Sequence, residues 1–211
     1  MKISALAILA VLTIGTASAQ QWEFGATGGG GLFNNVSASG AAAAATAGFA
    51  PGFATGVFVG QDIFTHFTGE IRYEYMQSDL KLSSGGQTAQ FNGLAHVLHY
   101  DMVYHFNTSK SRVQFYGALG GGVKAFFGTG TEEAFQPLSQ YGYFTKTNSI
   151  MPMGTVAAGV TYRIGQNLSL RTEIRDYVTG FPTAVLTPAP GVRYGSILHD
   201  VVPMVSIVYE K

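Results

Sequence analysis

The sequence predicts an all-β fold, an eight-stranded antiparallel up-and-down transmembrane β-barrel, and three observations lead to it. The first is composition, because 46% of the 211 residues are hydrophobic and only 11% are charged, against roughly 25% charged residues in an ordinary soluble domain. The second is a set of eight segments in which apolar and polar side chains alternate, which is typical of strands. The third is that the links between these segments are alternately short and long, as in a membrane barrel.

The first residues have the three parts of a secretory signal peptide. Lys2 provides the positive charge, residues 3–14 the apolar stretch, and Ala17, Ser18 and Ala19 the cleavage site. The apolar stretch is shorter than the roughly 20 residues that a spanning helix needs, which disfavours a membrane anchor. We therefore expect a signal peptide over residues 1–19, export of the chain, and an outer-membrane β-barrel domain over residues 20–211.

The eight expected strands differ in how clearly they alternate. The clearest is the seventh, where Leu170 and Ile174 take one face while Arg171, Glu173 and Arg175 take the other. The second is the weakest. The segments lie near residues 21–33, 53–60, 66–82, 90–106, 112–128, 153–164, 168–180 and 198–210.

The links and the aromatic residues distinguish a membrane barrel from a soluble sheet, which also alternates. Short links are expected at 60–66, 107–111 and 165–167, and longer ones at 34–52, 83–89, 129–152 and 181–197. Tyrosines such as Tyr73, Tyr104 and Tyr209 stand toward strand ends on the apolar face, where a membrane interface favours them. The Ala-rich segment 38–52, bracketed by glycine and proline, is expected to be a mobile external loop.

The polar faces point into the barrel, and eight strands leave an interior just wide enough for side chains. Five acids and five bases are expected there, and buried charges are tolerated only in pairs. We therefore predict an internal ion-pair network that closes the lumen. Its residues are Glu23, Glu70, Arg72, Glu74, Asp101, Lys124, Arg163, Arg171, Glu173 and Arg175.

Several kinds of chemistry are disfavoured. The 12 basic and 12 acidic residues balance, which leaves no basic surface for nucleic acid. Cysteine is absent, so disulfides and thiolate zinc sites are excluded. The glycine runs 28–31 and 120–122 lack the lysine and the helix of a phosphate loop, and they predict strand curvature instead.

One candidate for catalysis is His99, which shares a strand face with Asp101 and could act as a base. Ser83 or Ser149 could in principle be its nucleophile, but no spacing fixes a triad. A lumen histidine held by hydrogen bonds is the favoured interpretation, and acidic residues 132–133 are expected to be a solvated loop face. We predict no catalytic residue, no cofactor and no metal.

The segment 168–177, LSLRTEIRDY, combines apolar outward residues with an ionic inward face, and the last strand carries Val205, Ile207 and Tyr209 at every second position. With the signal peptide and the alternating links, the chain resembles small bacterial outer-membrane β-barrel proteins of the OmpA-like/OmpX-like class. Lys211 stands where that family usually has a terminal aromatic residue. The resemblance implies location in the bacterial outer membrane, contact with outer-membrane lipid and lipopolysaccharide, assembly by the barrel-assembly machinery with periplasmic chaperones, and a monomer.

The leading hypothesis is a barrel with a closed lumen that has a structural role in the envelope or presents its external loops to a partner. Aromatic residues of link 129–152 could supply loop contacts or could pack against neighbouring loops, namely Phe135, Tyr141, Tyr143 and Phe144. The alternatives are a porin-like channel for small solutes, a lipid-modifying or proteolytic barrel enzyme with His99 in its site, and a soluble periplasmic barrel that binds an apolar ligand.

Overall fold

A computed structural model describes residues 21–40, 44–107, 111–131 and 135–211. The expected signal peptide, residues 1–19, lies outside the described residues. In the part of the chain that the structure describes, no helix combines the length and apolar character needed to span a membrane.

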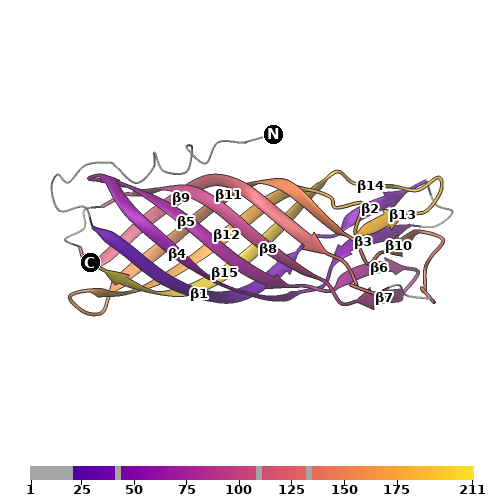
Figure 1. Ribbon diagram of the computed structural model, residues 1–211, viewed down its shortest axis with the longest axis horizontal. Helices are drawn as coiled ribbons and strands as arrows, with labels where there is room; N and C mark the ends of the chain where they lie inside the picture. Colours follow the sequence, from indigo (N-terminus) through magenta and orange to yellow (C-terminus); the bar gives the residue numbers. More distant parts are fainter. Residues whose placement is uncertain (1–20, 41–43, 108–110, 132–134) are drawn as a thin grey trace, which may run out of the picture.

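Eight long antiparallel strands close into a barrel, in the order β1-β15-β12-β11-β9-β8-β5-β4 (Figure 1). Each barrel strand therefore lies beside the barrel strands that precede and follow it in the chain, which confirms the expected up-and-down fold. The strands are β1 (Trp22–Phe33), β4 (Gly52–Phe64), β5 (Phe67–Gln77), β8 (Leu94–His105), β9 (Val113–Phe127), β11 (Asn148–Arg163), β12 (Leu168–Gly180) and β15 (Ile197–Glu210).

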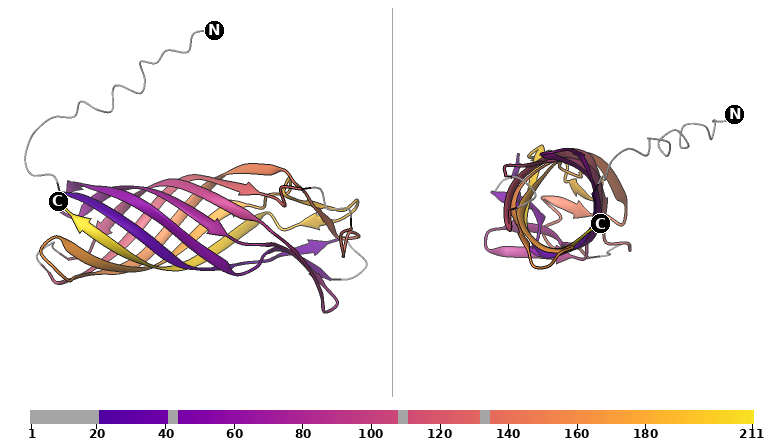
Figure 2. Two further views of the ribbon diagram at one scale, coloured as in Figure 1. Left: turned by 60° about the horizontal axis from the view of Figure 1, so that its bottom comes forward. Right: turned by 90° about the vertical axis from the view of Figure 1, so that its left-hand side faces the viewer.

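The first and last strands complete the ring, which the view along the barrel axis in Figure 2 shows. Ala26 of β1 pairs with Ile207 of β15 on one side and with Val57 of β4 on the other. At the end of the barrel, Trp22 and Lys211 exchange two backbone hydrogen bonds of 3.0 and 2.9 Å. Closure leaves no unpaired strand edge in the barrel wall, as hydrocarbon requires.

The long links form a folded extension at the opposite end of the barrel from Lys211, here called the cap (Figure 1). A five-stranded sheet has the order β14-β2-β3-β6-β7, and a separate pair is formed by β10 and β13. These strands are β2 (Val36–Ser39), β3 (Ala45–Phe49), β6 (Leu80–Ser84), β7 (Gln87–Phe91), β10 (Gly142–Phe144), β13 (Leu186–Pro188) and β14 (Arg193–Tyr194).

Two of the expected strands, 66–82 and 90–106, are each divided where the chain leaves the barrel for the cap. The breaks fall at Ser78–Asp79 and at Asn92–Gly93, and the N–H of Ser78 donates to the carbonyl of Gly93 at 3.3 Å. A Cβ atom on Gly93 would lie 2.8 Å from the carbonyl oxygen of Ser78. Glycine is therefore needed where the two bends approach each other.

The expectation of a mobile external loop over 38–52 is wrong for the described part of that segment. Residues 45–49 form β3, which pairs with β2 on one side and β6 on the other. Ala45, Ala47 and Phe49 are buried, so the alternation of small residues encodes an inward sheet face. Residues 41–43 lie outside the described residues.

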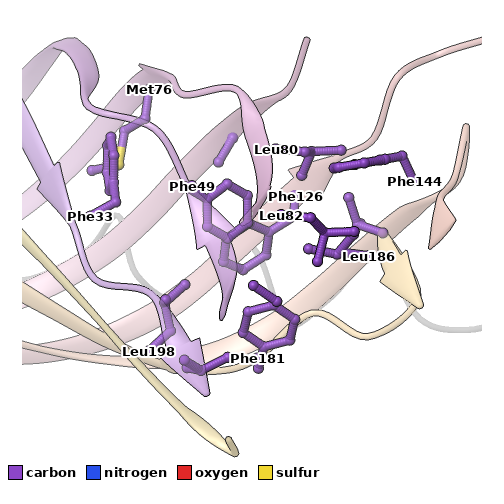
Figure 3. Packing of buried hydrophobic residues seen from close by; sticks show 14 of the residues in the cluster. Phe33, Phe49, Met76, Leu80, Leu82, Phe126, Phe144, Phe181, Leu186 and Leu198 are labelled. Atoms are coloured by element: carbon purple, nitrogen blue, oxygen red, sulfur yellow. The ribbon is translucent and has the colours of Figure 1, made fainter. Parts of the chain in front are cut away.

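The interior has two layers along the barrel axis. One is ionic and is described below, and the other is an apolar cluster that continues from the barrel into the cap, here called the cap core (Figure 3). In it the rings of Phe49 and Phe126 stack with centroids 5.4 Å apart, and Phe91 and Phe144 lie 4.7 Å apart. Leu82 and Leu186 are fully buried between the cap strands.

Candidate functional site in the lumen and the cap

The lumen is polar because every second side chain of a barrel strand points inward, and these inward residues are the polar ones. On β5 the inward residues are Glu70, Arg72 and Glu74, all completely buried, while the outward Ile71 and Tyr73 are exposed. The same division holds on β12 and β8. The barrel order places β5 and β12 on opposite walls, four strands apart in either direction, so charges from the two walls face each other across the lumen.

Arg72 lies at the centre of these contacts. Its guanidinium donates to Glu70 on its own strand at 2.7 Å and to Glu173 on the opposite wall at 2.6 Å, and Glu74 lies 3.4 Å away. The side chains of all four residues have no solvent exposure. Arg72 therefore connects two walls of the barrel through carboxylates that have no access to water.

Arg171 and Arg175 extend this network along the axis. Arg171 donates to Glu70 at 2.6 Å and to Glu23 of β1 at 2.7 Å. Arg175 donates to Asp101 of β8 and, at 3.1 Å, to Glu173. Each guanidinium thus binds two carboxylates from different strands, which is the arrangement that compensates the desolvation of a buried charge.

Aromatic residues complete the network. The hydroxyl of Tyr116 donates to Glu173 at 2.5 Å, and that of Tyr177 donates to Glu74. The ring of Phe58 lies 4.5 Å from the guanidinium carbon of Arg72 and 4.9 Å from that of Arg171. Its position depends on Gly25, the residue paired with it on β1, because a Cβ atom there would lie 2.1 Å from the ring.

Lys124 forms a separate ion pair beside the cap core. Its ammonium lies 2.5 Å from a carboxylate oxygen of Asp200 on β15, and the rings of Phe33, Phe126 and Tyr177 surround it at 5.6, 4.9 and 6.0 Å. A cation among aromatic rings retains favourable electrostatics in a dry site. This pair therefore joins the ionic layer to the apolar one.

Arg163 lies apart from the other predicted lumen residues. It pairs with Glu210 at 3.3 Å, and the side chain of Arg163 is 31% exposed. Of the ten predicted lumen residues, nine thus take part in ion pairs inside the barrel, and the tenth, Arg163, lies at the rim near Lys211. Sequence reasoning did not assign Asp200, Tyr116 or Tyr177 to the network, although Asp200 and Tyr177 stand on the predicted polar faces.

His99 forms a pair with Asp101, with Nδ1 2.9 Å from the carboxylate, while its Nε2 has no hydrogen-bond partner among the described residues. Neither serine proposed as a nucleophile is bonded to it, and the hydroxyl of Ser83 lies 3.1 Å from that of Thr88 in the cap. Asp101 also binds Arg175. Within the described ranges, no group of three histidine or acidic residues could hold a metal ion.

The four aromatic residues proposed for loop contact divide into two kinds. Phe135 is 82% exposed and Tyr143 is 43% exposed, whereas Tyr141 and Phe144 are buried. Tyr141 and Phe144 therefore belong to the cap core, which was the packing alternative. The backbone of Phe144 is held by the side-chain amide of Gln136 through two hydrogen bonds of 2.9 Å, which covers the open edge of β10.

The cap also contains a half-buried tyrosine, Tyr194. Tyr194 donates to the carbonyl of Tyr141 at 3.0 Å, and burial raises the pKa of this hydroxyl. The tyrosine therefore keeps its proton at neutral pH and remains a donor. This bond connects β14 of the larger sheet to the segment before β10.

The outer wall is apolar and carries aromatic rings toward both ends. Near the short turns, Phe67, Tyr104 and Phe106 form one group, with neighbouring centroids 5.1 and 5.3 Å apart. Toward the cap, Tyr73 and His96 stack with centroids 6.0 Å apart, and the Tyr73 hydroxyl lies 2.7 Å from the His96 ring nitrogen. Such paired girdles mark the two interfaces of a membrane barrel.

Comparison with known proteins agrees with this architecture. A family model described as "Outer membrane protein beta-barrel domain" matches residues 5–194. A search of curated protein sequences finds no match.

Three solved structures illustrate the shared fold. Neisserial surface protein A matches with 12% identity and a TM-score of 0.50, covering 90% of this chain and 96% of its own. The outer membrane protein OprG from Pseudomonas aeruginosa matches with 15% identity and a TM-score of 0.52, covering 90% and 95%. The outer membrane protein AlkL, solved in lipid bilayers, matches with 14% identity and a TM-score of 0.50, covering 94% of both chains. At these identities the likeness concerns the fold.

Proposed function

Because the chain belongs to the family of outer membrane protein β-barrel domains and so lies in the bacterial outer membrane, we propose that it is a non-conducting barrel that carries its folded cap outside the membrane. In this proposal the barrel is an anchor with a structural role in the envelope, and the cap is the surface presented to a partner. The barrel performs no catalysis.

The observation that carries the proposal is the filling of the lumen. The largest fully buried side chains include Arg72, Arg171, Arg175, Tyr116 and Lys124, all directed inward and bound to partners on other strands. Toward the cap, the apolar side chains of the cap core also fill the barrel interior. A solute would have to break ion pairs whose charges have no water to receive them, which costs several kcal/mol per ion.

Two further observations support a role without catalysis. Asp101, the partner of His99, also binds Arg175, and no hydroxyl nucleophile is bonded to the free nitrogen of His99 in the described chain.

The exposed rings of Phe135 and Tyr143 are the residues that we propose for contact with a partner, because large rigid rings supply contact area at low entropic cost. Three further points stay predictions: assembly by the barrel-assembly machinery and chaperones, contact with lipopolysaccharide, and a monomeric state.

A planar lipid bilayer tests the closed lumen. The folded full chain should give no stepwise current under an applied voltage, whereas a general porin measured in the same chamber should give steps. Folding is checked by comparing electrophoretic mobility in SDS before and after boiling. Reproducible unit steps from the folded chain would refute the proposal and favour the porin-like alternative.

A further inference from the structure

The outer face of β1 carries glycine where the rest of the wall carries large apolar side chains. Gly28 and Gly30 point outward between Phe24 and Leu32, in extended backbone without positive φ. A Cβ atom on Gly28 would lie 4.0 Å from its nearest neighbour, the carbonyl of Ala54, and one on Gly30 would lie 3.9 Å from the carbonyl of Gly52. Neither backbone conformation nor packing within the chain requires glycine at these two positions.

Gly28 borders a groove of about 470 Å³ on the outer wall, across β1, β15, β12 and β11. Its lining is almost entirely apolar. Gly28, Ala158, Thr172, Ile174, Pro203 and Val205 all contribute outward-facing atoms. The acid in the lining, Glu173, has its carboxylate bound to Arg72 and Tyr116 inside the barrel.

β1 and β15 approach each other closely beside the groove. A Cβ atom on Gly29 would lie 2.1 Å from the carbonyl oxygen of Pro203. Pairing between the two strands is interrupted after Gly29 and Met204 and resumes at Leu32 and Val201. Pro203 also has no N–H to offer β1, so the backbone ladder between β1 and β15 is interrupted beside the groove.

We propose that this groove binds one acyl chain of a membrane phospholipid. It lies on the apolar outer face, which contacts the hydrocarbon of the bilayer in this family, so the occupant that reaches it is a lipid chain. Between lipid and protein there is no hydrophobic gain, and association depends on van der Waals packing. A groove without an occupant forfeits those contacts along its whole lining.

A second copy of the chain is a poorer occupant. The rim side chains Ile174 and Val205 are 61% and 52% exposed and stand beside the glycine floor. Another barrel would offer a convex wall, which meets this rim before it reaches the floor. A thin flexible chain fits between the rim residues.

Photolabelling tests the site directly. The full chain is reconstituted in phosphatidylcholine vesicles that contain a small fraction of phosphatidylcholine with a diazirine in its acyl chain, and labelled peptides are mapped after irradiation. Peptides containing Gly28, Thr172 and Pro203 should be labelled several-fold more than the peptide with Leu98 and Tyr100, which are exposed on the opposite wall. Equal labelling around the barrel would mean ordinary boundary lipid and would overturn the proposal.

A matched pair of variants sharpens the result. Gly28→Leu fills the groove and should reduce labelling at Thr172 and Pro203 to the level of Leu98. Gly154→Leu adds the same side chain at another outward glycine of the wall, where a Cβ atom meets nothing within 4 Å, and should leave labelling unchanged. Ala158→Leu, at another residue that lines the groove, provides a second test if Gly28→Leu does not fold, as judged by heat-dependent mobility in SDS. Unchanged labelling in the folded groove variants, or a protein–protein crosslink through β1, would refute the proposal.

Discussion

Replacing Glu173 by leucine is expected to destabilise the barrel strongly. The carboxylate of Glu173 accepts hydrogen bonds from Arg72 at 2.6 Å, Arg175 at 3.1 Å and Tyr116 at 2.5 Å, and the residue is 4% exposed. Leucine fills most of the same volume but accepts none of these bonds. The variant therefore leaves two guanidinium groups with excess positive charge and one hydroxyl without its acceptor.

The size of this loss in stability depends on which ion pairs Arg72 and Arg175 keep. Arg72 retains Glu70 and Glu74, and Arg175 retains Asp101, so neither cation becomes wholly uncompensated. Removing one member of a buried ion pair costs about 3–5 kcal/mol of unfolding free energy. We expect a loss in that range for Glu173→Leu.

The assay is urea-induced unfolding in phospholipid vesicles, followed by the fraction that keeps the mobility of the folded barrel in unheated SDS. Glu210→Leu is the matched control, because Glu210 pairs with Arg163 at the rim, where the two side chains are 14% and 31% exposed. An ion pair near water contributes about 1 kcal/mol or less. If Glu173→Leu loses no more stability than Glu210→Leu, the interpretation of the lumen as a network of mutually dependent ion pairs is wrong.

Three other variants test the layers beyond this network. Asp200→Leu alone should lower the free energy of unfolding by about 3–5 kcal/mol, because it leaves Lys124 buried without its carboxylate. The double variant Lys124→Met/Asp200→Leu should recover most of that loss, since an apolar pair replaces a buried ion pair at little cost. Equal midpoints for the single and double variants in the same urea titration would contradict this. Leu186→Ala removes a fully buried side chain of the cap core and should destabilise the cap by about 2–5 kcal/mol. We expect faster protease cleavage of residues 135–147, while the barrel keeps its heat-dependent mobility in SDS. Unchanged cleavage would show that the cap core does not hold this segment.

The lumen could be predicted in part because the barrel repeats one rule. With a two-residue period and a narrow interior, the charged residues of the polar faces must point inward, as Glu70, Arg72 and Glu173 do. The partners were not predicted, because pairing depends on which strands oppose each other and on their axial stagger. Arg72 and Glu173 are 101 residues apart and meet because the third and seventh barrel strands lie on opposite walls.

The folded cap was the larger feature that the sequence did not predict. Its strands are short, with small residues such as Ala45 and Ala47 on the inward face, and composition alone suggests a loose loop. For Phe144 and Tyr141 the sequence left loop contact and packing both open. They are buried in the structure, because β7 and β10 come together only when the barrel brings the long links to one end.

The sequence by itself determined the all-β class, the number and course of the barrel strands, and the separation into an apolar and an ionic face, because each of these follows from a local two-residue period. Only the tertiary structure decided which charges pair, that the long links fold into a cap with its own apolar core, and where the outer wall is hollowed beside Gly28 and Pro203. These features depend on contacts between strands distant in the chain, whose register and spacing no local pattern encodes.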